Sequence, residues 1–414
     1  DKFDCKEIAP TVKVKDKYFL ELYHGPTCAF KDMALTLMPL LLETSLKKNN
    51  IKEDIVILTA TSGDTGKAAL EGFKNLNQIK IIVFFPEDGV SSIQKLQMQS
   101  QEGNNTYVVS INGNFDDAQS AVKTIFNDEE FKEILKNNNY ILSSANSINI
   151  GRLLPQIVYY FYSYFDLVRN KHIKLKDKIN FTVPTGNFGN ILAAYYAKLM
   201  GLPVNKLICT SNDNNVLYDF FNSGIYNKNR ELILTSSPSM DILISSNLER
   251  LLFEISSRDS EKVNNLIKDL NNKGLYKLDA NMKKNLNSFR SEYANELEVK
   301  RNINKVFKEY NYLIDTHTCV AYTSYMKYLK KHKDCTPTVI VSTASPYKFS
   351  KDVLYSLGEE VNNFDKFEII EKLSKFSHTE IPYPIKKLKT SLILHDENCE
   401  KDEIKSEIKK ILKM

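Results

Sequence analysis

Short apolar, β-branched runs alternate along this chain with longer segments whose apolar positions recur every three or four residues. The first clear pair is the apolar run DIVILTA at 54–60 and the helical pattern at 65–75. The segments 79–86 and 106–113 repeat the strand pattern, and each is followed by another helical pattern. Continuous apolar strands separated by helices are typical of βαβ units, so the pattern predicts a parallel sheet covered by helices.

A second series of the same kind begins near residue 178. Strand patterns at 179–185 and 205–212 enclose a helical pattern at 189–201. Residues 247–310 look mainly helical and lysine-rich, which places them in an outer layer. A late strand pattern at 336–344 returns to the core, and the tail at 402–413 has the pattern of an exposed amphipathic helix.

The two series predict an α/β fold with two domains, each built on a mostly parallel sheet flanked by helices. We expect a smaller α/β domain at 50–150. We expect residues 1–49 and 151–414 to form a larger α/β domain with helical additions, since a long helical pattern starts at about Ile150.

Composition supports a folded enzyme and excludes several other classes. The chain has 414 residues, of which 42% are hydrophobic and 26% charged, as in soluble globular proteins. The net charge of +5 comes from 56 basic and 51 acidic residues spread along the chain, so it predicts no nucleic-acid partner. The most apolar run, at 153–165, is too short and too polar at its edges to cross a bilayer, so we expect no membrane association.

The six cysteines are scattered and have no spacing that suggests zinc or another metal. This usage is typical of a reducing compartment, and we expect a cytoplasmic protein without a metal site.

One glycine-bearing turn could bind an anion. In TVPTGNFGN, residues 182–190, a strand runs into Gly186 and Gly189 at the start of a helix. Glycines let the backbone approach a ligand closely, and the free N–H groups of a helix start attract a phosphate. An ordinary β-α connection is equally compatible with this local pattern, because one glycine pair is weak evidence.

A second turn, TSGDTG at 61–66, has the same position after a strand and before a helix. Its hydroxyls and amide groups could hold a carboxylate. The alternative is simple helix capping by Ser62 or Asp64. Capping would explain one of these side chains but hardly the whole cluster between two glycines.

A third polar segment, SSANSINIGR at 143–152, follows another strand. Asn146, Ser147 and Arg152 could receive a second anion, with the arginine as its charged partner. A capped loop with a surface arginine is the simpler interpretation. The hydroxyls of Ser342, Thr343 and Ser345 end a later strand, where parallel sheets bind ligands.

The segment ELYHGPTCAFKDM at 21–33 places Lys31 among small and apolar residues. A free lysine has a pKa of about 10, but burial in an apolar pocket favours the neutral amine and permits Schiff-base chemistry. A surface lysine at a helix start is the ordinary alternative. An aldehyde cofactor with its own phosphate would use both Lys31 and the 186–190 turn, and pyridoxal 5'-phosphate is such a cofactor.

These motifs occur together, in order, in one known family. ELYHGPTCAFKD, TATSGDTG, SSANSIN, VPTGNFGN, DTHTCVAY and STASPYKF resemble the bacterial and fungal branch of the threonine synthase family, from about Phe19 to Phe349. The resemblance implies pyridoxal-phosphate fold type II, as in the tryptophan-synthase-β-like enzymes, with a cofactor cleft between two α/β domains. Relatives usually carry a helical N-terminal region before the lysine motif, and this region looks shortened or absent here.

The resemblance also assigns roles, residue by residue. Lys31 would be the Schiff-base lysine and proton shuttle. The cofactor phosphate would lie on Gly186, Asn187, Phe188, Gly189 and Asn190. Thr343 would meet the pyridine nitrogen, and Asp64 would lie near the ring oxygen. The substrate carboxylate would bind Thr61, Ser62 and Thr65, and the substrate phosphate would bind Asn146, Ser147 and Arg152.

The implied activity is that of a carbon-oxygen lyase that converts O-phospho-L-homoserine and water to L-threonine and phosphate, the last step of threonine biosynthesis. A related phospho-lyase that releases phosphate and 2-oxobutyrate remains an alternative. The only partner expected is this small-molecule substrate, with the chain acting as a monomer or homodimer. His317, in DTHTCVAY, has no assigned role, and a structural histidine is at least as compatible with the sequence.

Overall fold

The computed structural model describes residues 2–87, 90–113 and 115–414, and the chain divides into two compact units. Unit 1 comprises Asp1–Asp4, His24–Arg152 and Glu380–Met414, and unit 2 comprises Cys5–Tyr23 and Leu153–Thr379. Each unit has its own sheet, which fits the α/β fold predicted from the two series of strand and helix patterns.

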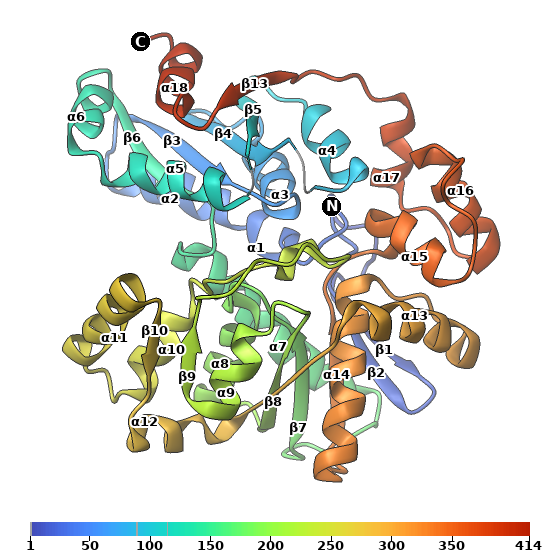
Figure 1. Ribbon diagram of the computed structural model, residues 1–414. Helices are drawn as coiled ribbons and strands as arrows, with labels where there is room; N and C mark the ends of the chain where they lie inside the picture. The colour runs from blue at the N-terminus through green and yellow to red at the C-terminus, as the bar shows by residue number, and fades with distance from the viewer. Residues whose placement is uncertain (1, 88–89, 114) are drawn as a thin grey trace. The chain divides into compact units, whose positions relative to one another are not determined.

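Unit 1 is built on a five-stranded sheet in which all neighbouring strands are parallel, in the order β13-β5-β4-β3-β6 (Figure 1). The strands are β3 (Asp54–Ala60), β4 (Ile79–Pro86), β5 (Thr106–Asn112), β6 (Tyr140–Ser144) and β13 (Glu397–Glu400). The helices are α1 (Asp32–Leu35), α2 (Met38–Lys48), α3 (Asp64–Phe73), α4 (Ser92–Gln99), α5 (Phe115–Asn127), α6 (Glu129–Asn137), α17 (Tyr383–Lys387) and α18 (Ile404–Leu412).

The sheet of unit 1 is apolar on both faces because helices cover both. Side chains alternate along a strand, so Ile55 and Ile57 of β3 pack into one core with Phe73 of α3. Val56 of β3 lies in the other core with Ile408 of α18. Coverage of both faces explains why the central strands are continuous apolar runs in the sequence.

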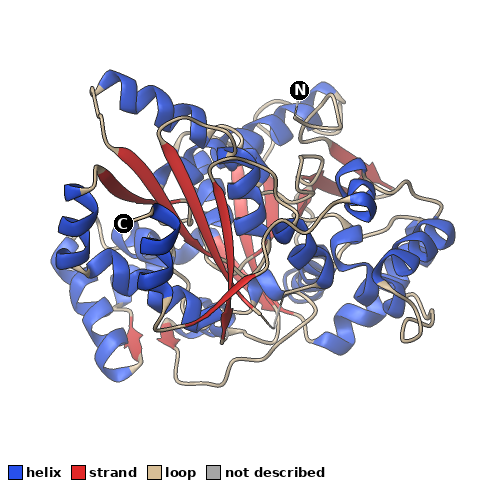
Figure 2. Cartoon of the chain, turned by 90° about the horizontal axis from the view of Figure 1, so that it is seen from above, coloured by secondary structure: helices blue, strands red, loops and turns tan. Residues whose placement is uncertain are grey.

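Unit 2 is built on a six-stranded sheet in the order β1-β2-β12-β7-β8-β11, parallel except for the hairpin β1-β2. The strands are β1 (Thr11–Val14), β2 (Lys17–Glu21), β7 (Ile179–Pro184), β8 (Val204–Ser211), β11 (Phe289–Tyr293) and β12 (Thr338–Ser342); β9 (Ile225–Asn227) and β10 (Leu275–Lys277) form a small separate sheet. In Figure 2 the red strands run between blue helices.

The helices of unit 2 follow its strands and fill the segments between them. Those that belong wholly to the unit are α8 (Gly189–Leu199), α9 (Val216–Ser223), α10 (Leu248–Ile255), α11 (Ser260–Lys273), α12 (Ala280–Asn285), α13 (Glu296–Tyr310), α14 (Thr316–His332), α15 (Ser350–Ser356) and α16 (Lys366–Ser377). The long helix α7 (Ile150–Arg169) begins at the end of unit 1, and its residues from Leu153 onward belong to unit 2.

The units divide the chain differently from the predicted domains, most extensively in two segments. Residues 24–49 belong to unit 1, because α1 and α2 pack against α3. The tail also belongs to unit 1, because β13 pairs with β5 across almost 300 residues of sequence. The predicted tail helix is present as α18, but its exposure was wrong, since Ile408 and Leu412 are buried.

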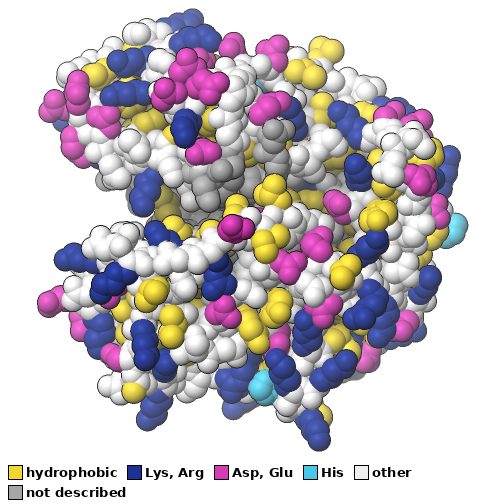
Figure 3. Space-filling model, in the orientation of Figure 1, with side chains coloured by type: hydrophobic (Ala, Val, Ile, Leu, Met, Phe, Trp, Pro, Cys, Tyr) yellow, Lys and Arg dark blue, Asp and Glu magenta, His cyan; other side chains and the backbone are white. Residues whose placement is uncertain are grey.

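Charged side chains of both signs are mixed over the face shown in Figure 3. A mixture of both signs is typical of a solvated protein surface. Within the residues that the structure describes, no helix combines the length and the apolar character needed to cross a membrane.

A turn in unit 2 yields a prediction about acid stability. Burial raises the pKa of Asp334, but hydrogen bonds from Thr336, Tyr328 and Asn180 outweigh this effect and hold the pKa at about 2, below the usual 3.8. The carboxylate therefore stabilises the fold fully above about pH 4, and this contribution disappears as the pH falls toward 2.

We expect Asp334→Asn to lower the free energy of unfolding by about 1 kcal/mol at pH 7, allowing for solvent screening of a partly exposed group. The difference from wild type should shrink when urea unfolding is repeated at pH 4 and then pH 3. A constant difference over this range would contradict the assignment.

Candidate functional site

Lys31 lies directly before α1 in unit 1 and is 8% exposed. Its Nζ is 3.4 Å from Oδ2 of Asp64, and it lies over the ring of Phe30 at 4.8 Å from the ring centre. A buried ammonium needs a charged or aromatic partner of this kind. The prediction that Lys31 is buried, and not a surface lysine at a helix start, is confirmed.

The loop before Lys31 is held by the residue after it. The carboxylate of Asp32 accepts hydrogen bonds from the N–H of Thr27 at 2.8 Å and from its hydroxyl at 2.6 Å. A Cβ on Gly25 would lie 2.5 Å from Oδ2 of Asp32, so only glycine fits beside this carboxylate. Residues 25–27, here called the GPT loop, are therefore braced against the start of α1, and together they support Lys31.

The TSGDTG turn joins β3 to α3 and places Asp64 beside Lys31. The hydroxyl oxygen of Thr61 accepts from the N–H groups of Gly63 at 3.0 Å and Gly66 at 2.8 Å, so Thr61 shapes the turn from inside. Gly63 occupies the N-cap of α3 with no side-chain cap, which makes the helix-capping alternative wrong. Oδ1 of Asp64 accepts from Nε2 of Gln94 at 2.8 Å, a partner on α4 that the sequence did not indicate.

The 143–152 segment lies next to this turn. Its strand β6 is the parallel neighbour of β3, and Nδ2 of Asn146 donates to the carbonyl of Ala60, directly before the turn, at 3.0 Å. Arg152 is 3% exposed and donates to the carbonyl of Ala145 at 2.6 Å. The interpretation of Arg152 as a surface arginine is therefore wrong. Ser147 is half-buried. The two loops predicted to bind substrate lie side by side in unit 1.

The GNFGN turn follows β7 in unit 2 and is held by its carbonyl groups. The hydroxyl of Ser245 donates to the carbonyl of Gly186 at 2.7 Å, and Asn247 donates to the carbonyl of Asn187 from its N–H at 3.1 Å and its Nδ2 at 2.9 Å. A trans peptide points each following N–H away from its carbonyl. The N–H groups of Asn187 and Phe188 therefore face away from this support.

Several donors of this turn have no acceptor among the residues that the structure describes. They include the N–H groups of Asn187, Phe188 and Gly189, which lie at the start of α8. They also include Nδ2 of Asn190, which is buried, whereas its Oδ1 accepts from the hydroxyls of Tyr159 at 2.5 Å and Tyr160 at 2.6 Å. Unpaired N–H donors at a helix start are the arrangement that binds phosphate.

Thr343 lies at the same edge of the unit 2 sheet. It follows β12, the parallel neighbour of β7, so the carboxyl ends of these strands present Thr343 and the GNFGN turn together. Thr343 is buried, and the preceding Ser342 shares a hydrogen bond of 2.8 Å with the hydroxyl of Thr318. Ser345 instead caps the short helix that follows, since its hydroxyl accepts from the N–H of Tyr347 at 3.3 Å.

Both groups of residues lie in a part of the chain that matches a known family of enzymes. Residues 3–344 match the pyridoxal-phosphate dependent enzyme family. The chain is 37% identical over 402 residues to threonine synthase from Saccharomyces cerevisiae, covering 91% of this chain and 77% of the yeast protein. This chain belongs to the threonine synthase family. The resemblance inferred from the six motifs is therefore confirmed.

Two further threonine synthase relatives define how far the match extends. The crystal structure of pyridoxal-phosphate-bound threonine synthase from Brucella melitensis has a TM-score of 0.85 at 34% identity, covering 100% of this chain and 82% of that chain. This match confirms the predicted fold class. Human threonine synthase-like 1 is 41% identical over 372 residues, covering 87% of this chain but 49% of the human protein, so the chain spans about half the length of that relative.

The residues present fit the cofactor of the threonine synthase family. Its phosphate requires hydrogen-bond donors. The turn at Asn187 offers N–H groups, together with the buried Nδ2 of Asn190, that have no acceptor within the described part of the chain. Its aldehyde requires an amine, and Lys31 presents a buried one held by Asp64. Backbone and side-chain groups of this chain therefore provide what both the phosphate and the aldehyde require.

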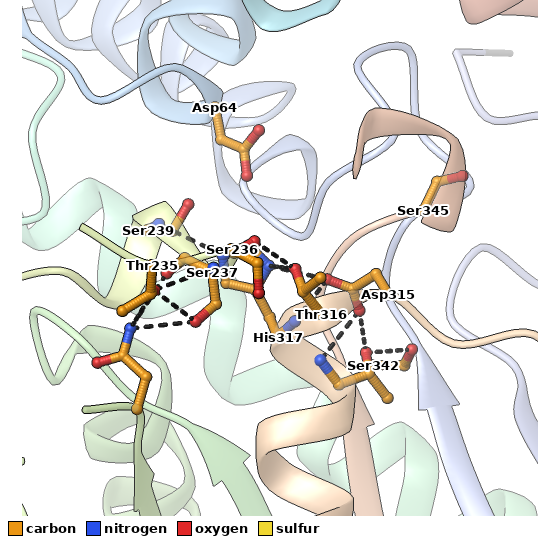
Figure 4. A network of polar contacts seen from close by, with 12 residues as sticks. Asp64, Thr235, Ser236, Ser237, Ser239, Asp315, Thr316, His317, Ser342 and Ser345 are labelled. Atoms are coloured by element: carbon orange, nitrogen blue, oxygen red, sulfur yellow. Dashed lines mark hydrogen bonds and ion pairs between the residues drawn. The ribbon is translucent and has the colours of Figure 1, made fainter. Parts of the chain in front are cut away.

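Sequence reasoning missed a polar network, shown in Figure 4. Its residue Ser239 lies against Gly186 of the 186–190 turn, here called the phosphate turn for the anion it is predicted to bind. Nδ1 of His317 lies 2.8 Å from Oδ2 of Asp315, and Nε2 of His317 accepts from the N–H of Ser239 at 3.3 Å. Asp315 and His317 are close in sequence, but Ser239 is 78 residues away from His317. The DTHT motif was the only local signal, and it gave no information about Ser239.

Proposed function

We propose that this chain converts O-phospho-L-homoserine and water to L-threonine and phosphate with pyridoxal 5'-phosphate as cofactor. The observation that carries this proposal is the burial of Lys31 against Asp64, beside the two polar loops of unit 1. Membership of the threonine synthase family supports the choice of reaction. The reaction balances, because phosphate leaves Cγ of the substrate and the oxygen of water is added at Cβ.

The cofactor would contact the residues that the family resemblance assigns to it. Lys31 would bond to its aldehyde carbon and Asp64 would lie near its ring oxygen. The turn Gly186–Asn190 would bind its phosphate and Thr343 would meet its pyridine nitrogen. Bound pyridoxal phosphate supplies an electron-accepting ring that makes the substrate's carbon-bound protons acidic enough to remove.

The substrate would be held by the two loops of unit 1. Ser62 and Thr65 are half-buried and would donate to its carboxylate, together with the amide groups of their turn. Thr61 would contribute by keeping the turn in shape, because its oxygen already accepts from two backbone N–H groups. Asn146, Ser147 and Arg152 would bind the substrate phosphate, and the buried guanidinium is a geometrically matched partner for such an anion.

Lys31 would also move the proton at Cα of the substrate. Proton transfer needs a group whose protonation state can change, and a buried amine beside a carboxylate meets this requirement. Asp64 would orient the amine, and Gln94 in turn orients Asp64 through its Nε2. The GPT loop braced by Asp32 would keep Lys31 at one place through the reaction.

A reducing compartment such as the cytoplasm is part of this proposal. Four of the six cysteines are buried, namely Cys28, Cys209, Cys319 and Cys399. Burial raises the pKa of Cys209 to about 12, so this thiol does not react readily at neutral pH.

The purified chain, incubated with pyridoxal phosphate and O-phospho-L-homoserine, should release phosphate and L-threonine in equal amounts. Both products are measured in the same samples, phosphate by a colour assay and threonine by mass spectrometry. Phosphate accompanied by 2-oxobutyrate in place of threonine would overturn the water addition and support the phospho-lyase alternative. Absence of phosphate release would overturn the proposed function as a whole.

A further inference from the structure

The polar network of unit 2 begins at the start of α14, where Asp315 is fully buried. Its Oδ1 accepts from the N–H of Thr318 at 3.0 Å, and its Oδ2 accepts from the N–H of His317 at 3.0 Å. The same Oδ2 lies 2.8 Å from Nδ1 of His317. A carboxylate that caps a helix in this way acts as an acceptor throughout, so Nδ1 of His317 must be the nitrogen that carries the proton.

This tautomer leaves Nε2 of His317 as an acceptor, and it receives the N–H of Ser239 at 3.3 Å. A second contact lies beside it, because the hydroxyl of Thr316 donates to the carbonyl of Ser236 at 2.7 Å. The start of α14 therefore holds residues 235–241, here called the serine loop, at two points. Figure 4 shows the side chains of Thr316 and His317 directed at this loop.

The far side of the serine loop packs against the turn predicted to bind the cofactor phosphate. A Cβ on Gly186 would lie 2.5 Å from the carbonyl oxygen of Ser239 and 3.2 Å from Cα of Met240. Backbone therefore touches backbone at this point, with no flexible side chain between to absorb movement. A displacement of Ser239 would displace Gly186 with it.

The serine loop also has an anchor of its own. Burial raises the pKa of Asp241, whose Oδ1 accepts from Nδ2 of Asn212 at 2.7 Å and from the hydroxyl of Thr235 at 2.7 Å. This anchor fixes the two ends of the loop. The bond to His317 acts at a different point, on Ser239, the residue lying on Gly186.

We propose that His317 is a positioning residue for the phosphate turn: the Asp315–His317 pair holds the serine loop against Gly186 and so sets the affinity for pyridoxal phosphate. The inference rests on the proposed function. His317 acts through Ser239 and Gly186, and it exchanges no proton with the substrate. Its part in the reaction is to keep the N–H groups of the 187–189 turn in the geometry that a phosphate requires.

Two substitutions of similar size separate this role from simple support of α14. His317→Asn keeps a donor that can reach Asp315, but its side chain is too short to reach Ser239. His317→Gln places its amide oxygen where Nε2 lies and can accept from Ser239. Tyr328→Phe is the control, because it removes a different hydrogen bond of α14, the one donated to Asp334 at 2.7 Å.

The dissociation constant of pyridoxal phosphate is measured for each full-length variant by absorbance titration, with the melting temperature of the cofactor-free protein recorded alongside. We expect His317→Asn to raise the dissociation constant about tenfold, the effect of one buried hydrogen bond. His317→Gln should stay within about threefold of wild type. Tyr328→Phe should lower the melting temperature without changing the dissociation constant.

Equal dissociation constants for His317→Asn and wild type would overturn the inference, as would equal weakening by the asparagine and glutamine variants. Nitrogen-15 NMR of His317 gives an independent result that does not depend on activity. A proton on Nδ1 supports the inference, whereas a proton on Nε2 overturns it. If wild type itself fails to bind pyridoxal phosphate, the proposed function falls, and the NMR result still decides the tautomer.

Discussion

Replacement of Lys31 by alanine is expected to reduce threonine formation by about a thousandfold or more, because it removes both the covalent attachment of the cofactor and the group that moves the Cα proton. The visible absorbance band of lysine-bound pyridoxal phosphate should disappear. The fold should persist, because Lys31 lies at the edge of a four-residue helix and its partner Asp64 keeps the hydrogen bond from Gln94. Product analysis and a spectrum of the same preparation check both results.

Two controls separate amine chemistry from charge. Lys31→Arg keeps a cation beside Asp64 but has no amine that can bond to an aldehyde, so it should be as inactive as the alanine variant while melting close to wild type. Lys198→Met removes another partly buried lysine, whose Nζ donates to the carbonyl of Val204 at 2.6 Å, and should keep full activity. An absorbance band and threonine production in Lys31→Ala would contradict the assignment.

The buried central strands were predictable from sequence because their environment is uniform. β3, β4, β5 and β7 lie inside sheets, so nearly every residue is buried and the apolar run stands out. β11 was missed inside the helical prediction for 247–310. It lies at the edge of its sheet and pairs with β8, and its sequence FRSEY mixes charged and apolar residues.

Contacts between distant parts of the sequence could not be predicted. Residues 397–400 have no strand character of their own and form β13 because β5 offers a free edge. The same limit explains why the tail helix looked exposed. The buried Ile408 belongs to an amphipathic pattern that any surface helix would show. The sequence alone does not say which element covers the apolar face of the helix.

The candidate site shows the same division between local and distant information. The position of Lys31 before an acid and the GNFGN turn are local patterns. The structure places a buried amine at the first and, at the second, N–H groups that no described residue accepts from. Gln94 and Ser239 belong to no local motif, because their partners Asp64 and His317 lie 30 and 78 residues away in the sequence. Residues that orient the site are therefore harder to predict than residues that would touch its ligands.

The structure adds a second reason for a glycine at position 186. From the sequence, close approach of a ligand is the reason for a glycine at this position. In the structure its α-carbon also lies against the backbone of Ser239 and Met240, and an added methyl group would come within 2.5 Å of the carbonyl oxygen of Ser239. The glycine is therefore required by the protein's own packing, which a single sequence does not reveal.

Gly186→Ala is accordingly expected to weaken pyridoxal-phosphate binding about a hundredfold and to lower the free energy of unfolding by about 1–3 kcal/mol. The added methyl group meets backbone atoms that cannot rotate away, so the turn must move and its N–H groups lose their common direction. Cofactor titration measures the first effect, and urea unfolding of the cofactor-free protein measures the second.

Gly201→Ala provides a control at the other end of α8. Gly201 has φ +105 with nothing within 4 Å of an added Cβ, so alanine there introduces backbone strain without a collision. This variant should lose about 1 kcal/mol of stability while binding pyridoxal phosphate like wild type. If both glycine variants bind the cofactor with wild-type affinity, the contact between the serine loop and Gly186 does not control the turn. If only Gly186→Ala weakens cofactor binding, the packing of the serine loop against Gly186 controls the N–H donors of the turn.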